Sequence, residues 1–222
     1  MNRDIVIRAA PFAAYLLFLA IEDLAAGMPG VDFDIRWLYA VKAGLVAAIL
    51  LFLIRDYEEL RRLPGNRLWL LAGAPAVGAV VFALWIHLDQ GFLNLGDHPG
   101  FDPRSGADGT IDWRLDAVRL AGATLVVPVM EELFWRSFLM RWIDRQDFLS
   151  IAPAAVSLKA VLVASITFGF AHSLWLAGII AGLVYAWLYR ASGSLWPPIL
   201  AHAVTNGLLG IWVLRTGSWQ FW

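Results

Sequence analysis

Long apolar segments recur along this chain, and they constrain its fold more than any other feature. A membrane span needs about 20 mostly apolar residues, and we interpret seven segments as spans. They cover residues 5–24, 37–54, 68–88, 117–140, 158–172, 175–189 and 195–214. Only 16% of the residues are charged, against about 25% in soluble domains. The sequence therefore predicts an all-α, polytopic transmembrane helical bundle of about seven spans, forming a single membrane domain.

The charges between these segments alternate along the chain. Residues 55–67 carry four arginines, whereas residues 89–114 carry five aspartates against two arginines. Because short cytoplasmic loops are enriched in Lys and Arg, we expect the N-terminus to be cytoplasmic. No basic tract indicates a nucleic-acid partner, and the lipid bilayer is the expected surrounding. A chain without cysteine forms no disulfide and no thiolate metal site.

Residues 158–189 are almost continuously apolar but too short for two full spans and a loop. We expect either a tight hairpin around His172 and Ser173, or one short arm whose turn lies within the membrane. Non-helical backbone at that depth must be buried in protein or line a water-filled cavity. The small residues Gly178 and Gly182 are four apart, a spacing that lets helices approach closely. We interpret this pair as packing rather than chemistry.

A charged cluster interrupts the apolar segment 117–140. Ionisable residues inside a membrane are costly and mark candidate functional sites. Glu132 and Arg136 are four residues apart, so on a helix they form a pair on one face. Glu131 points elsewhere and has no local partner, as expected of a general base. A plain salt bridge between helices would explain Glu132 and Arg136 but not Glu131.

Two later apolar segments each carry a histidine. His172 follows Phe168 by four residues, and His202 precedes Asn206 by four. Each pair alone is ambiguous, because hydrogen-bonding side chains also hold membrane helices together. Taken with Glu131, they place polar groups on three separate spans, which predicts one shared cavity. From the arginine-rich connections we expect this site to be reached from the cytoplasmic side.

These segments resemble the CAAX protease and bacteriocin-processing (CPBP) family of intramembrane proteases, which includes the Ras-converting CAAX endopeptidase. The family pattern is EExxxR, then FxxxH, then HxxxN, on successive helices. The matching residues are Glu131, Glu132, Arg136, Phe168, His172, His202 and Asn206. The resemblance covers residues 115–214, which we define as the protease core. Residues 1–114 would then form an N-terminal part of three spans and an acidic loop.

The resemblance implies a membrane-embedded peptidase acting on membrane-associated proteins or peptides. It implies that Glu131 activates water with His172, and that His202 and Asn206 stabilise the oxyanion. Glu132 and Arg136 would shape the site. The residue types allow a zinc ion on Glu131, His172 and His202, and equally a metal-free base with an oxyanion hole. The sequence leaves these two catalytic types open and indicates no other cofactor.

Other interpretations stay open beside the protease. The same fold could serve as a non-proteolytic scaffold or immunity protein, or the ionisable groups could relay protons in a small transporter. The aspartates of residues 89–114 lack the spacing of an EF-hand calcium loop. The compact chain resembles bacterial members of the family, which suggests the bacterial inner membrane. We do not carry over the prenyl specificity of the eukaryotic members.

Overall fold

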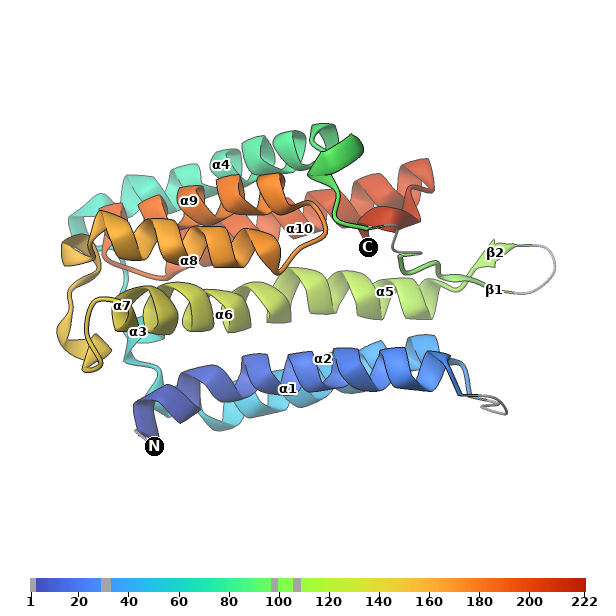
Figure 1. Ribbon diagram of the computed structural model, residues 1–222, viewed down its shortest axis with the longest axis horizontal. Helices are drawn as coiled ribbons and strands as arrows, with labels where there is room; N and C mark the ends of the chain where they lie inside the picture. Colours follow the sequence, from blue (N-terminus) through green and yellow to red (C-terminus); the bar gives the residue numbers. More distant parts are fainter. Residues whose placement is uncertain (1–2, 29–32, 97–99, 106–108) are drawn as a thin grey trace.

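The protein is a bundle of helices that run roughly along one axis (Figure 1). The structure is a computed structural model that describes residues 3–28, 33–96, 100–105 and 109–222. The α-helices outside the region 113–142 are α1 (Arg3–Ala26), α2 (Leu38–Phe52), α3 (Glu58–Arg61), α4 (Leu68–His87), α8 (Leu158–Phe170), α9 (Trp175–Ser192) and α10 (Trp196–Thr216). Short 3₁₀ turns cover Ile35–Trp37, Ile54–Asp56, Gly65–Arg67, Gly91–Leu93, Phe148–Ser150, Pro153–Ala155 and Trp219–Phe221. The predicted all-α bundle is confirmed.

Residues 113–142 form one helical run of changing pitch. Its segments are α5 (Trp113–Ala121), a π-helical stretch (Gly122–Val126), α6 (Val127–Glu132), a second π-helical stretch (Leu133–Leu139) and α7 (Met140–Trp142). The Asp112 side chain caps its start by accepting hydrogen bonds from two backbone N–H groups. Pro128 has no N–H to donate, and it lies just after the first π-helical stretch. Such local widening of a helix is frequent at functional sites.

Four segments of the described chain are long and apolar enough to cross a membrane. They are Arg3–Ala26, Ile35–Phe52, Gly65–His87 and Trp196–Thr216. The chain is therefore a multi-pass membrane protein, while the count of seven spans stays a prediction. A small antiparallel ribbon, β1 (Arg104–Ser105) with β2 (Thr110–Ile111), interrupts the loop before α5.

The α8–α9 hairpin is shorter than a full crossing. The 13 residues of α8 span about 20 Å, less than the roughly 30 Å of a hydrocarbon core. The loop after α4 covers the turn, because Leu95 N–H donates to Ser173 O at 2.9 Å and Trp175 Nε1–H donates to Phe92 O at 2.9 Å. The first bond pairs a backbone carbonyl of the turn with the loop, and both bonds favour the interpretation in which one arm is short and its turn lies within the membrane.

Glycines set the closest helix contacts. A Cβ on Gly178 of α9 would lie 2.8 Å from the Cα of Gly169 in α8, and one on Gly78 of α4 would lie 2.3 Å from the Ala201 carbonyl oxygen of α10. Both distances are too short for any side chain without movement of the backbone. The predicted packing role of the Gly178 face is confirmed.

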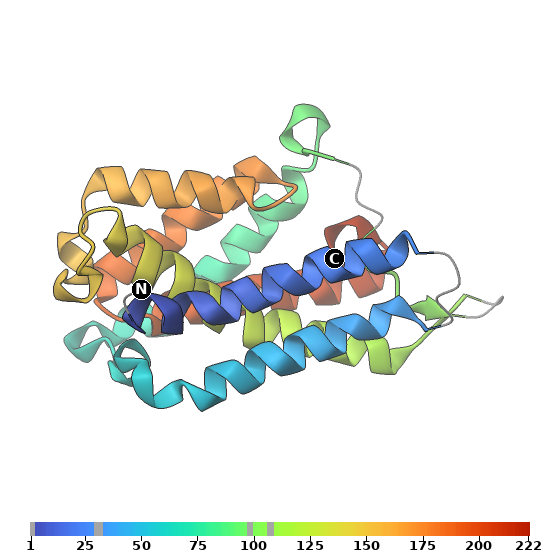
Figure 2. The same cartoon turned by 60° about the horizontal axis from the view of Figure 1, so that its bottom comes forward.

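A buried ion cluster ties α1, α3 and α7 together at the end of the bundle that holds the N-terminus (Figure 2). Arg8 Nε lies 2.6 Å from Glu59 Oε1, and Arg141 Nη2 lies 3.2 Å from the same oxygen. Arg8 is 1% exposed and Arg141 is 4% exposed. In the sequence, Glu59 is more than 50 residues from Arg8 and more than 80 from Arg141. Local spacing therefore does not predict these contacts.

Candidate active site

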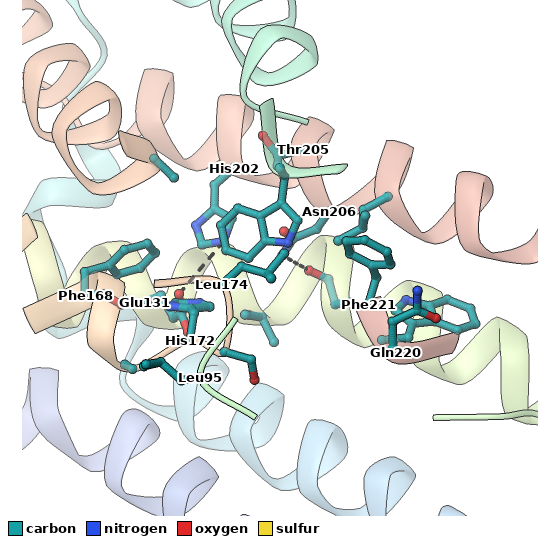
Figure 3. A pocket seen from close by; sticks show the side chains of 18 of the residues that line it. Leu95, Glu131, Phe168, His172, Leu174, His202, Thr205, Asn206, Gln220 and Phe221 are labelled. Carbon is teal, nitrogen blue, oxygen red and sulfur yellow. Dashed lines mark hydrogen bonds and ion pairs between the residues drawn. The ribbon is translucent and has the colours of Figure 1, made fainter. Parts of the chain in front are cut away.

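Side chains from all three motifs line one cavity of about 1100 Å³. Glu131 comes from α6, His172 from the α8–α9 turn, and His202 and Asn206 from α10 (Figure 3). The ring of Phe168 contacts both imidazoles, at 4.6 Å from the His172 ring and 6.2 Å from the His202 ring. The predicted convergence of the three segments is confirmed, whereas the chemical role of each residue stays a prediction.

Glu132 is fully buried and holds two partners. Its Oε2 lies 3.2 Å from Arg136 Nε, and its Oε1 lies 3.0 Å from His202 Nδ1. The ion pair predicted from the spacing of Glu132 and Arg136 is thus confirmed. Arg136 is fixed further by Gly182 O, which accepts from its Nη2 at 3.4 Å, and by the Phe168 ring 4.4 Å below its guanidinium carbon. Glu132 therefore orients both the arginine and the imidazole.

Glu131 is buried but lacks a hydrogen bond on one oxygen. Its Oε2 has no hydrogen-bond partner and lies 3.9 Å from His202 Nε2. That separation is too long for a hydrogen bond. A carboxylate oxygen and an imidazole nitrogen thus face one another across a gap in the cavity wall. A buried group left unsatisfied is costly unless something else binds it, so Glu131 is a candidate for binding a water or a reacting group.

The tautomer of His172 follows from its backbone contact. Its Nδ1 lies 2.8 Å from Phe168 O. A carbonyl oxygen only accepts, so Nδ1 carries the proton and Nε2 of the neutral ring is an acceptor. The ring packs edge-on against Trp85 of α4, with 5.5 Å between centroids. His172 is therefore held as a proton acceptor beside the cavity.

Asn206 and a tyrosine–threonine pair complete the wall. Asn206 Nδ2 donates to Ala123 O at 2.9 Å, which leaves its second N–H and its carbonyl oxygen for another partner. The Tyr185 ring stacks on His202 with centroids 5.0 Å apart, and its hydroxyl donates to Thr205 Oγ1 at 2.8 Å. Sequence reasoning missed this support for His202. Thr205 could have been found because it adjoins Asn206 in the chain, but no local sequence pattern singles out Tyr185.

The ligand set suggested for zinc does not form a metal site. Across the described ranges, no three His, Asp or Glu side chains gather closely enough to hold a metal ion. His202 has one ring nitrogen on Glu132 and the other 3.9 Å from Glu131. The donor geometry therefore does not fit a three-ligand zinc centre. In the acidic loop, Asp97, His98 and Asp108 lie outside the described residues, Asp102 pairs with Arg104, and Asp112 caps α5.

The cavity extends away from the arginine-rich end. Its lining includes Asp89 and Asn94 from the loop after α4, and Gln220 and Trp222 from the C-terminal tail. These segments lie toward the end that carries β1 and β2, whereas α3 lies at the other end (Figure 1). None of the described residues of the arginine-rich connection 55–67 lines it. This lining favours entry from the other end of the bundle, and the side of access stays a prediction.

Fold and site together define a multi-pass helical membrane protein with a Glu–His site in an interior cavity. Residues 113–208 match the family model described as Type II CAAX prenyl endopeptidase Rce1-like. The match covers just under half of the 222 residues and confirms the resemblance to the CPBP/CAAX protease family. It supports a hydrolase of the protease class. No curated protein and no solved structure matches the chain.

Proposed function

We propose that the protein is an intramembrane endopeptidase that hydrolyses peptide bonds of membrane-associated proteins or peptides. The observation that carries the proposal is the unpartnered oxygen of Glu131, buried in a cavity beside two imidazoles. A general base must reach its proton directly or through one water. Glu131 and His172 both offer acceptor atoms, so they suit the binding and deprotonation of a water molecule.

In the proposed reaction, Glu131 takes a proton from water as the oxygen attacks the carbonyl carbon of the peptide bond. The carbonyl oxygen then gains negative charge, and the free N–H of Asn206 and Nε2–H of His202 donate to it. Collapse of the tetrahedral intermediate breaks the C–N bond, and Glu131 returns its proton to the leaving amine. Fixed donors of this kind act strongly in a site that excludes water.

Glu132 and Arg136 support this role of His202. Since Nδ1 of His202 donates to Glu132, the ring must also carry a proton on Nε2 to donate to the oxyanion. With His202 protonated, the two glutamates carry two negative charges, and Arg136 and His202 carry two positive ones. This balance reduces the cost of burying the cluster. No step requires a metal ion, and we propose a metal-independent, glutamate-type enzyme.

Residues 1–114 contribute to the same cavity, whose lining includes Tyr15, Tyr39 and Trp85. We therefore propose that this N-terminal part helps bind the substrate, while residues 115–214 carry the reacting groups. We place the protein in a bacterial inner membrane with its N-terminus cytoplasmic. In that orientation the cavity receives substrates from the side of the loop after α4, outside the cytoplasm.

The substitution Glu131→Gln tests the proposal. The protein is reconstituted in liposomes with a defined mixture of synthetic peptides, and new carboxyl ends are detected by mass spectrometry in heavy-oxygen water. We expect Glu131→Gln to fold normally and to lose at least about a hundredfold in cleavage rate, the lower range for loss of a general base. Equal cleavage by wild type and variant would refute the role of Glu131. Absence of cleavage by the wild type would favour the scaffold or immunity interpretation.

A further inference from the structure

The cavity has a second charged position far from Glu131. Arg119, Ala123, Val127 and Glu131 all line it, and they follow one another at every fourth position of the helical run 113–142. Twelve residues of helix extend about 18 Å. Along this row of the helix, only Ala123 and Val127 lie between the two charged ends. A substrate lying along this row meets a base at one end and a guanidinium at the other.

Arg119 differs from the buried cations of the described chain in having no carboxylate partner. Arg8 and Arg141 pair with Glu59, Lys42 pairs with Glu22 at 2.7 Å, and Arg136 pairs with Glu132; these are the buried cations. No ion pair joins Arg119 to any described residue, and its Nε is buried without a hydrogen-bond partner. Arg119 as a whole is partly buried, and a guanidinium without a carboxylate partner can bind an anion.

Aromatic rings hold the Arg119 guanidinium in place. Its central carbon lies 4.3 Å from the centroid of Tyr39 and 5.4 Å from that of Phe101. The Tyr39 ring also contacts Lys42, whose ammonium nitrogen is 5.1 Å from the ring centroid. The planar N–H edge of an arginine matches the two oxygens of a carboxylate.

We propose that Arg119 binds a carboxylate of the substrate while the scissile bond lies at Glu131. This inference rests on the proposed function and adds a substrate class, peptides with an acidic group. An extended chain advances about 3.3 Å per residue, so the 18 Å row places the carboxylate about five residues from the cleaved bond. The carboxylate is either the C-terminus of the substrate or the side chain of Asp or Glu.

Asp116 is the nearest acidic residue to Arg119 along the helix. It offers a competing explanation, in which Arg119 balances the charge of Asp116. It lies one turn before Arg119, is 4% exposed, and has one oxygen without a hydrogen-bond partner. The two side chains form no ion pair in the structure. If Arg119 serves mainly to balance Asp116, then Asp116→Asn and Arg119→Gln will both lower the unfolding temperature and will affect all peptides alike.

The test measures cleavage and binding with matched peptides in proteoliposomes. One peptide ends in a free carboxylate about five residues beyond its cleaved bond; a second ends in an amide, and a third has an amide end and a glutamate at that position. We expect Arg119→Gln to raise KM about tenfold, equivalent to about 1.4 kcal/mol, for peptides that carry the recognised carboxylate. It should leave kcat and the amide peptide nearly unchanged. The exposed Arg114→Gln, on the same helix, is the matched control and should change nothing.

Binding by the Glu131→Gln variant separates this inference from the proposed function. Fluorescence anisotropy of the labelled peptides on Glu131→Gln, with and without Arg119→Gln, needs no turnover. If Arg119→Gln lowers the affinity for the acidic peptides only, the proposed role of Arg119 is supported even if no peptide is cleaved. Preference for the free acid identifies the C-terminal carboxylate, and preference for the glutamate peptide identifies a side chain. The proposal is overturned if acidic and amide peptides bind with equal affinity, or if Arg119→Gln lowers the affinity for both kinds of peptide equally.

Discussion

Three charged or ionisable side chains of the site depend on one another at the scale of single residues. Glu132 has two partners, Arg136 at 3.2 Å and His202 at 3.0 Å, and all three side chains are buried. Removing one member leaves another charge without compensation in a medium of low polarity. The site therefore also stabilises the fold. Some substitutions within it remove a reacting group, and others destabilise the protein.

Arg136→Ala should destabilise the protein rather than only inactivate it. The variant leaves Glu132 buried beside an empty space, and breaking a buried ion pair costs about 3–5 kcal/mol. We expect a lower yield and a lower unfolding temperature in detergent, measured by scanning fluorimetry on the tryptophans. The exposed Arg145→Ala is the control and should unfold like the wild type. A stable Arg136→Ala protein would show that Glu132 does not need this partner.

At the scale of elements, the α8–α9 hairpin positions His172 through contacts between backbones. Gly178→Ala would place a Cβ 2.8 Å from Gly169 Cα, where no flexible side chain can give way. We expect a loss of about 1–3 kcal/mol, as for other overpacked sites, together with reduced cleavage because the turn that holds His172 is displaced. Gly44→Ala is the control, since its Cβ meets nothing within 4 Å.

Unfolding temperature and cleavage rate, measured on the same preparations, decide this case. A Gly178→Ala variant with both values unchanged would mean that the hairpin tolerates separation of its helices. Loss of stability with normal cleavage would mean that the position of His172 does not depend on this contact.

The sequence predicts features that depend on local spacing, and it misses those that depend on distant partners. The helices, the Glu132–Arg136 pair and the Gly178 contact all follow from residues a few positions apart. The partners of Arg8 and Arg141 are set by tertiary packing, and so is the stacking of Tyr185 on His202. The side from which the cavity is reached depends on how the loop after α4 and the C-terminal tail fold back, which hydropathy does not encode.

At the scale of the whole molecule, the Glu59 cluster should make the fold sensitive to acid. Burial alone would raise the pKa of Glu59, but hydrogen bonds and charge from Arg8 lower it below its ordinary value of 4.5. A group whose pKa is depressed by folding stabilises the protein above its unfolded pKa, and that stability is lost as the pH falls through the folded value. We expect the unfolding temperature to fall as the pH drops below about 4.5.

Two neighbouring variants test this pH dependence. Glu59→Gln should be less stable at neutral pH, because Arg8 and Arg141 lose their partner, and its unfolding temperature should change less between about pH 6 and about pH 3. Glu58→Gln is the control, since the Glu58 side chain is 70% exposed, and it should follow the wild type. An equal acid response in Glu59→Gln and wild type would place the acid-sensitive group elsewhere.

The central claim is that hydrolysis takes place in the interior cavity, which is reached from the side of the C-terminal tail. The chain has no native cysteine, so Val127→Cys places a single thiol on the cavity wall. A membrane-impermeant thiol reagent is added to oriented proteoliposomes from either side, with Gln220→Cys and Arg62→Cys marking the two faces, and peptide cleavage is then measured. We predict that Val127→Cys is modified, and cleavage is blocked, only from the side on which Gln220→Cys reacts. Modification from the Arg62→Cys side, or full modification without loss of cleavage, would contradict the account.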